Sequence, residues 1–126
     1  MIYFIQQEDD PDGLIKIGFV ENPEARLASI QNYSPVKLRI LRTIKVPNNK
    51  EAEKALHKLF ETERAWGEWF RPSQFIKDMI NEFDDNILKS FIAILVYAYF
   101  RRSGAIEDIY TEYGVTHQSD GTKINA

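Results

Sequence analysis

Two groups of polar side chains have types and spacings suited to chemistry on a charged substrate. Glu53 and His57 are four residues apart in EAEKALHKLF, which puts a carboxylate and an imidazole on one ridge of a helix. Lys37, Arg39 and Lys45 alternate with mostly apolar residues, and this pattern predicts a strand with one buried face and one basic face. The first pair suits metal binding or proton transfer, and the basic face suits contact with phosphate groups.

A second acid, Glu68, lies in the aromatic segment WGEWF, where the neighbouring rings could fix its carboxylate against a packed wall. Each candidate also has an ordinary structural interpretation. His57 could pair with Glu53 or Glu61 along its own helix, and Glu68 could be a turn acid. The basic residues could form only a solvated face; they are Lys37, Arg39, Lys45 and Lys50.

The surrounding sequence predicts a small α+β domain. A polar turn joins two short runs of apolar, aromatic and β-branched residues, over 2–6 and 14–20, which predicts an antiparallel hairpin. Helix-start signals stand at Asn22-Pro23, Asn48-Asn49, Ser73 and Asp84. The expected order is strand 2–6, strand 14–20, a helix from 22, strand 37–46, a helix over about 50–64, a helix from 73 and a helix ending near 103. We therefore expect a three-stranded antiparallel sheet flanked by helices, with an extra C-terminal helix.

Length and charge set the domain organisation. The 126 residues fit one domain with an appendage, which we divide into a domain over 1–83, a helical extension over 84–114 and a flexible tail over 115–126. The net charge of −3 argues weakly against a nucleic-acid partner. However, residues 1–77 carry 12 basic against 11 acidic side chains, whereas residues 78–126 carry 4 against 8. A local basic face in the first part is therefore compatible with the bulk charge.

Several classes are excluded or disfavoured by composition. The chain has no cysteine, which excludes disulfides, cysteine zinc sites and thiol nucleophiles and fits a cytoplasmic protein. No signal peptide is apparent, and the longest apolar run, 91–100, is shorter than the ~20 residues that cross a bilayer. The helix around that run is apolar nearly all round, so we expect it to be buried in the domain or in a homodimer.

Five motifs in order resemble the GIY-YIG endonuclease superfamily, and within it the branch of phage-open-reading-frame and meiotically-up-regulated-gene type. They are IYFIQ (2–6), LIKIGFV (14–20), NPEARLASIQ (22–31), EAEKALHKLF (51–60) and GEWFRPS (67–73). The resemblance covers about residues 1–83. It implies a β-β-α-β-α core and a metal-dependent phosphodiesterase that acts on DNA with one Mg²⁺, or Mn²⁺, per site.

The resemblance also assigns residues to roles. Tyr3 matches the family's first tyrosine, Lys16 stands at the aromatic position of the second motif, and Arg26 matches the helical arginine. His57 matches a histidine typical of the branch. The metal carboxylate stays open between Glu68 and Glu53, because Mg²⁺ prefers oxygen ligands.

On this basis Tyr3 would act as general base or orient the attacking water. A phenol with a pKa of ~10 needs a neighbouring cation to lower it, and Lys16 is the expected one. Arg26 would grip phosphate oxygens with its planar fork, and His57 would contact phosphate or water or protonate the leaving group. The structural alternatives are core packing for Tyr3, a solvated lysine for Lys16 and a bridge to a helix acid for Arg26.

The first functional hypothesis is therefore a small Mg²⁺-dependent DNA endonuclease. Its specificity would come from DNA shape, a dimer or a partner, since the domain has no added recognition module. A catalytically inactive DNA-binding module and a protein-interaction or regulatory domain of the same fold are the alternatives.

Overall fold

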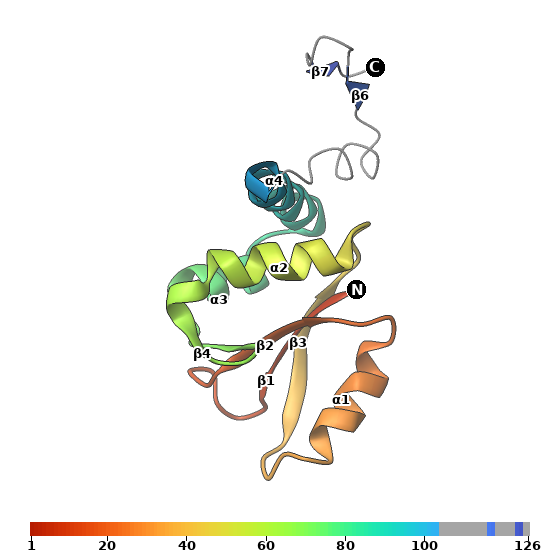
Figure 1. Ribbon diagram of the computed structural model, residues 1–126. Coiled ribbons are helices and arrows are strands. Elements are labelled where there is room, and N and C mark those ends of the chain that lie inside the picture. The colour runs from red at the N-terminus through yellow and green to blue at the C-terminus, as the bar shows by residue number, and fades with distance from the viewer. Residues whose placement is uncertain (104–115, 118–122, 125–126) are drawn as a thin grey trace.

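The protein has an α+β architecture built around a five-stranded antiparallel sheet (Figure 1). The computed structural model describes residues 1–103, 116–117 and 123–124. The strands are β1 (Ile2–Gln7), β2 (Ile15–Phe19), β3 (Leu38–Ile44), β4 (Arg64–Trp66) and β5 (Trp69–Phe70), in the order β3-β1-β2-β5-β4. The predicted hairpin of β1 and β2 is confirmed.

The prediction of three strands is wrong, because β4 and β5 extend the sheet beyond β2. These strands have three and two residues, too few for an alternating pattern to identify them. The turn between them is made by Gly67, whose φ of 53° lies in the left-handed region that favours glycine. The aromatic segment WGEWF therefore forms most of a short hairpin.

Four α-helices and one turn of 3₁₀ helix accompany the sheet in the described part of the chain. They are α1 (Pro23–Gln31), α2 (Asn49–Leu59), the 3₁₀ turn η1 (Glu61–Glu63), α3 (Gln74–Asn81) and α4 (Asp85–Ser103). The predicted N-caps of α1 and α3 are confirmed: the Asn22 side chain accepts from the Ala25 N–H, and Ser73 from the Ile76 N–H, both at 3.2 Å. These bonds satisfy amide groups that a helix start leaves open.

Helix α2 is shorter than predicted, because it ends at Leu59 instead of near Arg64. Phe60, the residue after the helix, is buried in the larger core cluster. Arg64 then begins β4 and pairs with Phe70 of β5. Tertiary pairing therefore takes these residues out of a helix that their intrinsic propensity would allow.

Strand β3 contains an irregularity that the alternating pattern hid. Its register with β1 shifts between Phe4 and Ile5, so that Ile5 faces Ile40 while Phe4 faces Arg42. As a result Leu38 and Ile44, both buried, belong to different core clusters. The expectation of one continuous basic face along this strand is therefore wrong, since a bulge exchanges the faces of the sheet.

The core lies on both faces of the sheet. The larger cluster joins the sheet to α2, α3 and α4, with Phe4, Leu56 and Phe70 fully buried. The smaller one includes Tyr3 and Ile5 and packs against α1. Figure 1 shows α2 between the sheet and α4, with α1 on the other side of the sheet. This leaves β1 and β2 central and fixes the side chains that they carry.

Helix α4 packs on α2 by one face only. Leu88, Ile92 and Val96 are buried, whereas Ile87 and Ile94 are exposed. No helix in the described residues is long and apolar enough to cross a membrane. Of the predicted tail over 115–126, the structure describes only β6 (Thr116–His117) and β7 (Lys123–Ile124), which pair with each other; the rest lies outside the described residues.

Candidate functional site

The site begins with a tyrosine that lies against a glycine across the central hairpin. Tyr3 faces Gly18 in the β1–β2 register and is 1% exposed. A Cβ atom added at Gly18 would lie 2.4 Å from the Tyr3 hydroxyl oxygen, so only glycine leaves room for the ring here. Lys16 lies opposite Ile5 on the same face, because alternate residues of paired strands share a side. Tyr3 and Lys16 therefore share a face of the hairpin.

The Tyr3 hydroxyl is the partner of Arg26 from α1. The guanidinium lies close enough to the phenol to act on the pKa of Tyr3, and the phenol acts on the pKa of Arg26 in turn. Burial nevertheless raises the pKa of Tyr3 above its ordinary value, and the nearby Glu68 and Glu53 add to this, although Arg26 acts in the opposite direction. The expectation that a neighbouring Lys16 lowers the Tyr3 pKa is therefore wrong. The raised pKa favours the neutral phenol, and the role of Tyr3 toward a substrate stays a prediction.

Lys16 is engaged with an acid instead. Its Nζ lies 2.8 Å from Glu68 Oε2 in an ion pair that joins β2 to the turn between β4 and β5. The Lys16 side chain is 11% exposed, and its Nζ lies 5.6 Å from the centroid of the Trp69 ring. A cation over an indole face gains further attraction. The pair holds Glu68 over the sheet face that carries Tyr3.

Glu53 on α2 is a carboxylate whose surroundings disfavour its charged form. Burial raises its pKa above the ordinary value, and repulsion from Glu68 raises it further. The nearby Phe19 backbone and the charge of Lys16 lower the pKa of Glu53 and partly offset both effects. Two half-buried carboxylates that repel one another form a place where a cation is favoured.

His57 lies one helical turn after Glu53 and is tied to β2. Its Nε2 is 2.7 Å from the Ile17 carbonyl oxygen, and its ring packs 5.0 Å from that of Phe70. Because a carbonyl only accepts, Nε2 must donate, and Nδ1 is left as the acceptor nitrogen of the neutral ring. Burial lowers the pKa of His57, which favours that neutral form.

The structure thus brings six of the ten predicted residues into one neighbourhood. Glu68 is the common element, since its charge acts on Tyr3, Arg26, Glu53 and His57 and it pairs with Lys16. Which of these residues act on a substrate stays a prediction. Among the described residues no three His, Asp or Glu side chains form a group able to hold a metal ion.

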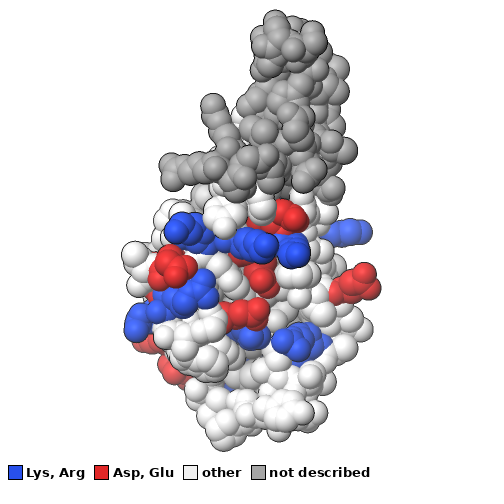
Figure 2. Space-filling view, viewed as in Figure 1, with Lys and Arg blue, Asp and Glu red and all other residues white. Residues whose placement is uncertain are grey.

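The four predicted DNA-contacting residues do not join this neighbourhood. They are exposed and lie within β3, directly beside its two ends and at the start of α2: Lys37, Arg39, Lys45 and Lys50. Lys37 pairs with Glu8 at 3.3 Å, and Arg39 lines a small cavity beside Lys77 of α3. Figure 2 shows basic and acidic side chains interleaved on the viewed face. Their role toward DNA stays a prediction.

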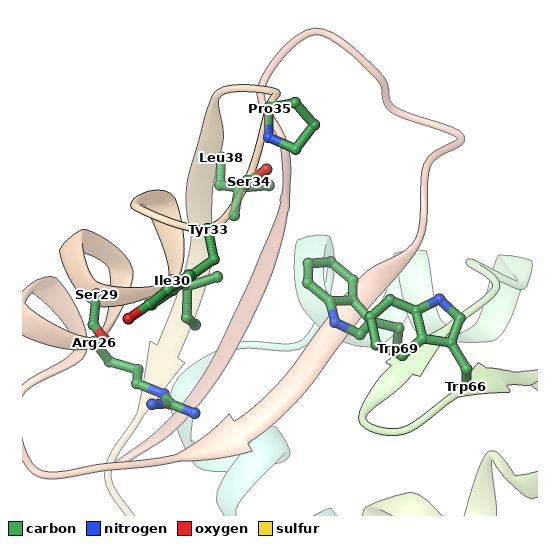
Figure 3. Close-up of a pocket in the computed structure, with 9 residues that line it drawn as sticks. All are labelled: Arg26, Ser29, Ile30, Tyr33, Ser34, Pro35, Leu38, Trp66 and Trp69. Atoms are coloured by element: carbon green, nitrogen blue, oxygen red, sulfur yellow. The ribbon is translucent and has the colours of Figure 1, made fainter.

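A trough opens beside Arg26, and the sequence interpretation did not foresee it. It has a volume of about 420 Å³ and lies between α1 and the β4–β5 hairpin, with Arg26 and Tyr33 on one wall and Trp66 and Trp69 on the other (Figure 3). Trp66 is 63% exposed. Two tryptophans three residues apart around a Gly-Glu turn were the available signal, but the rings of WGEWF were interpreted as a packed wall for Glu68.

Comparison with known proteins places the chain in a class and then in a family. The fold and motifs are those of the GIY-YIG-like, phage-open-reading-frame endonuclease-type group. Residues 1–84 match the model of the T5orf172 domain, and the chain belongs to that family. No curated protein and no solved structure matches the chain significantly. Membership indicates a nuclease-like or DNA-binding module.

Proposed function

We propose that the protein is a Mg²⁺-dependent DNA endonuclease whose site is the cluster around Glu68. The observation that carries the proposal is that a guanidinium, a second carboxylate and a neutral imidazole all lie close enough to Glu68 for its charge to act on them. Hydrolysis of a phosphodiester needs a grip on the phosphate, an acceptor for the proton of water and neutralisation of developing charge. Each of these tasks has a candidate group in the cluster.

Arg26 is the phosphate ligand in this proposal. Its guanidinium can bind two oxygens of one phosphate, and the neutral Tyr3 hydroxyl restricts its orientation. His57 receives the proton of the attacking water at Nδ1, since Nε2 is committed to Ile17. Lys16 positions Glu68 through the 2.8 Å ion pair. Tyr3 and Lys16 are therefore positioning residues.

Glu53, with Glu68 beside it, fits the divalent cation that the family implies. The fit rests on the raised pKa of Glu53, which burial and the Glu68 charge cause together, because a cation would relieve both costs. Mg²⁺ is commonly held by one or two carboxylates, with water and substrate phosphate completing its shell. When bound, it would polarise the phosphoryl oxygens and lower the pKa of water.

The test is cleavage of end-labelled linear duplex, single-stranded and flap DNA, and of supercoiled plasmid, with Mg²⁺ or Mn²⁺ and with EDTA. We expect Glu53→Gln and Arg26→Ala to lower the single-turnover rate by about 10²-fold or more, a loss typical of a deleted charge-stabilising group. Glu51→Gln, on the same helix and outside the cluster, is the matched control. Manganese binding, followed by paramagnetic resonance, should be lost in Glu53→Gln and kept in Glu51→Gln. Absence of cleavage by the wild type on every substrate would contradict the proposal.

A catalytically inactive DNA-binding module is the second candidate, and one contact favours it. Glu68 already has a cationic partner in Lys16, which leaves Glu53 as the carboxylate open to a metal. This candidate predicts DNA binding that weakens with salt, unaffected by EDTA and with no product. Binding and cleavage measured on the same substrates separate the two.

A further inference from the structure

The trough beside Arg26 has the size and lining of a ligand site. We call it the tryptophan trough and define it by Arg26, Ser29, Tyr33, Leu38, Trp66 and Trp69. Its volume of about 420 Å³ lies within the range of small-molecule sites, ~300–1,000 Å³. Figure 3 shows the side chain of Arg26 extending from α1 toward the indole side of the trough. A ligand here would meet the phosphate-binding group of the proposed site and an aromatic wall together.

Of the two tryptophans in the aromatic wall, one is held by strand pairing and the other is exposed to solvent. Trp69 is fixed by its place in β5, opposite Lys16, and by the Lys16 ammonium near its ring. Trp66 lies with its ring centroid 6.0 Å from that of Trp69 and is 63% exposed. Tyr33, on the other wall, is exposed as well. Flat, solvent-facing rings beside a cation are what single-stranded nucleic-acid sites present to bases.

The two cavities that share Trp66 and Trp69 differ in the charge of their lining residues. In the trough Arg26 is the charged residue, and no acid is in the lining. A second cavity of about 400 Å³ shares Trp66 and Trp69 but is lined by Asp10 and Asp12. Carboxylates repel a phosphate backbone. A DNA strand would therefore enter the trough from the Arg26 side and would not extend past the two indole rings into the cavity lined by acids. The trough thus suits a base with its phosphate toward Arg26.

We propose that the tryptophan trough binds an unpaired nucleobase of the DNA substrate, stacked on Trp66, next to the phosphate held by Arg26. The inference rests on the proposed function and narrows its substrate class to DNA with a single-stranded segment. A base inside a duplex is covered on both faces by its neighbours, so it offers no face to an indole. A flap, a bubble or a single strand does.

The first experiment uses the fact that the chain has two tryptophans, both in the trough. A single-stranded oligonucleotide is titrated against the full chain in EDTA while indole emission is followed. We expect quenching in the wild type and most of it lost in Trp66→Leu. Trp66→Ala should weaken single-strand binding roughly 5- to 150-fold, the range of one lost stacking contact, and Trp66→Phe should keep most of the affinity.

Two controls separate stacking from a structural effect. Ile94→Ala changes an apolar side chain of similar exposure, 66%, on α4 and should leave affinity unchanged. Oligonucleotides with one abasic residue, placed at each position in turn, should bind the wild type more weakly at one position. At that position the abasic change and Trp66→Ala should not add, because both remove the same contact.

Each remaining result overturns the inference. If the wild type binds the oligonucleotide in a salt-dependent manner without quenching, and Trp66→Ala binds equally well, the trough is not a base site while the proposed function stands. If Trp66→Ala weakens single strand, abasic strand and duplex alike, Trp66 has a structural role only. If the chain binds no DNA of any form, the trough inference and the proposed function fail together.

Discussion

Tyr3 owes its position to the residue that faces it, since the hydroxyl lies where a Gly18 side chain would be. We expect Gly18→Ala to cost about 1–3 kcal/mol of unfolding free energy, as overpacking usually does, and to displace Arg26 from its partner. Urea unfolding measures the first effect and single-turnover cleavage the second.

Gly67→Ala is the comparison for that variant. A Cβ at Gly67 meets nothing within 4 Å, but the φ of 53° makes the substitution strained, at a cost of about 1 kcal/mol. Its cleavage should stay close to wild type while that of Gly18→Ala falls. An unfolding midpoint for Gly18→Ala equal to that of the wild type would contradict the close approach.

His57 should link stability to pH. Its pKa is lowered in the folded protein because the ring is buried, so the folded state binds this proton less readily than the unfolded chain does. The contribution of His57 to the free energy of unfolding is therefore complete above its unfolded-state pKa of 6.5. It is lost as the pH falls from 6.5 through the lower pKa of the folded state. Urea unfolding from pH 7.5 to 5 should show a drop that His57→Gln reduces. A nuclear magnetic resonance titration of His57 giving a pKa above 6.5 would contradict this.

At the residue scale the sequence predicted which side chains lie close together where their spacing is local. Strand pairing and helix periodicity sufficed to place Tyr3 with Lys16 and Glu53 with His57, because both spacings are local. The partners across the chain were not predictable. Glu68 attaches to Lys16, 52 residues away, and that contact depends on the β4–β5 hairpin, which has no pattern of its own.

Among the elements, α3 is attached to β3 through one side chain. Arg42 Nη1 donates to the carbonyl oxygens of Met79, Ile80 and Phe83 at 3.3, 3.0 and 2.5 Å, and Nη2 pairs with Asp85 at 2.8 Å. A cation that satisfies the open carbonyls at a helix end stabilises that end. Arg42 therefore connects β3 to the end of α3 and the start of α4.

We expect Arg42→Ala to lower the unfolding free energy by about 2–4 kcal/mol, since it leaves partly buried carbonyls without a donor. Arg39→Ala on the same strand, where the side chain is exposed, should change it by less than about 0.5 kcal/mol. Thermal and urea unfolding of both variants provide the measurement. Equal effects of the two substitutions would show that the carbonyl contacts carry no stability.

The elements differ in how far the sequence determined them. Caps at Asn22 and Ser73 predicted α1 and α3 because a short polar side chain at a helix start has a local function. The bulge in β3 and the early end of α2 at Leu59 depend on what lies opposite in the fold. Neither leaves a local signature, so both predictions were wrong there.

For the whole molecule, ion pairs limit how strongly DNA can be attracted. In the described residues Lys16, Lys37, Arg42, Arg64 and Lys77 each pair with an acid, and the net charge of the chain is −3. We therefore expect few phosphate contacts. A plot of log K against log salt for single-stranded DNA should have a slope of about −1 to −2, as for one to three phosphates. Anisotropy titrations from 25 to 200 mM salt measure it, and a slope steeper than about −5 would contradict this reading of the surface.

A homodimer through α4 remains a prediction with a direct test. Ile87 and Ile94 are exposed on a helix whose other face packs on α2, and apolar side chains of this kind are common at interfaces. Sedimentation should show association that Ile94→Glu abolishes, whereas Lys89→Glu on the same helix should not. A wild type that sediments as a monomer at all concentrations would remove the dimer.

The contact between Gly18 and Tyr3 also constrains the order in which this hairpin can diverge. A larger residue at position 18 is strained as long as Tyr3 is present. The reason is that its Cβ atom would lie 2.4 Å from the Tyr3 hydroxyl oxygen. Loss of the aromatic ring must come first or at the same time. Among descendants, a bulky residue at 18 should therefore accompany a small one at 3, and such a pair would identify a domain that has given up its anchored guanidinium.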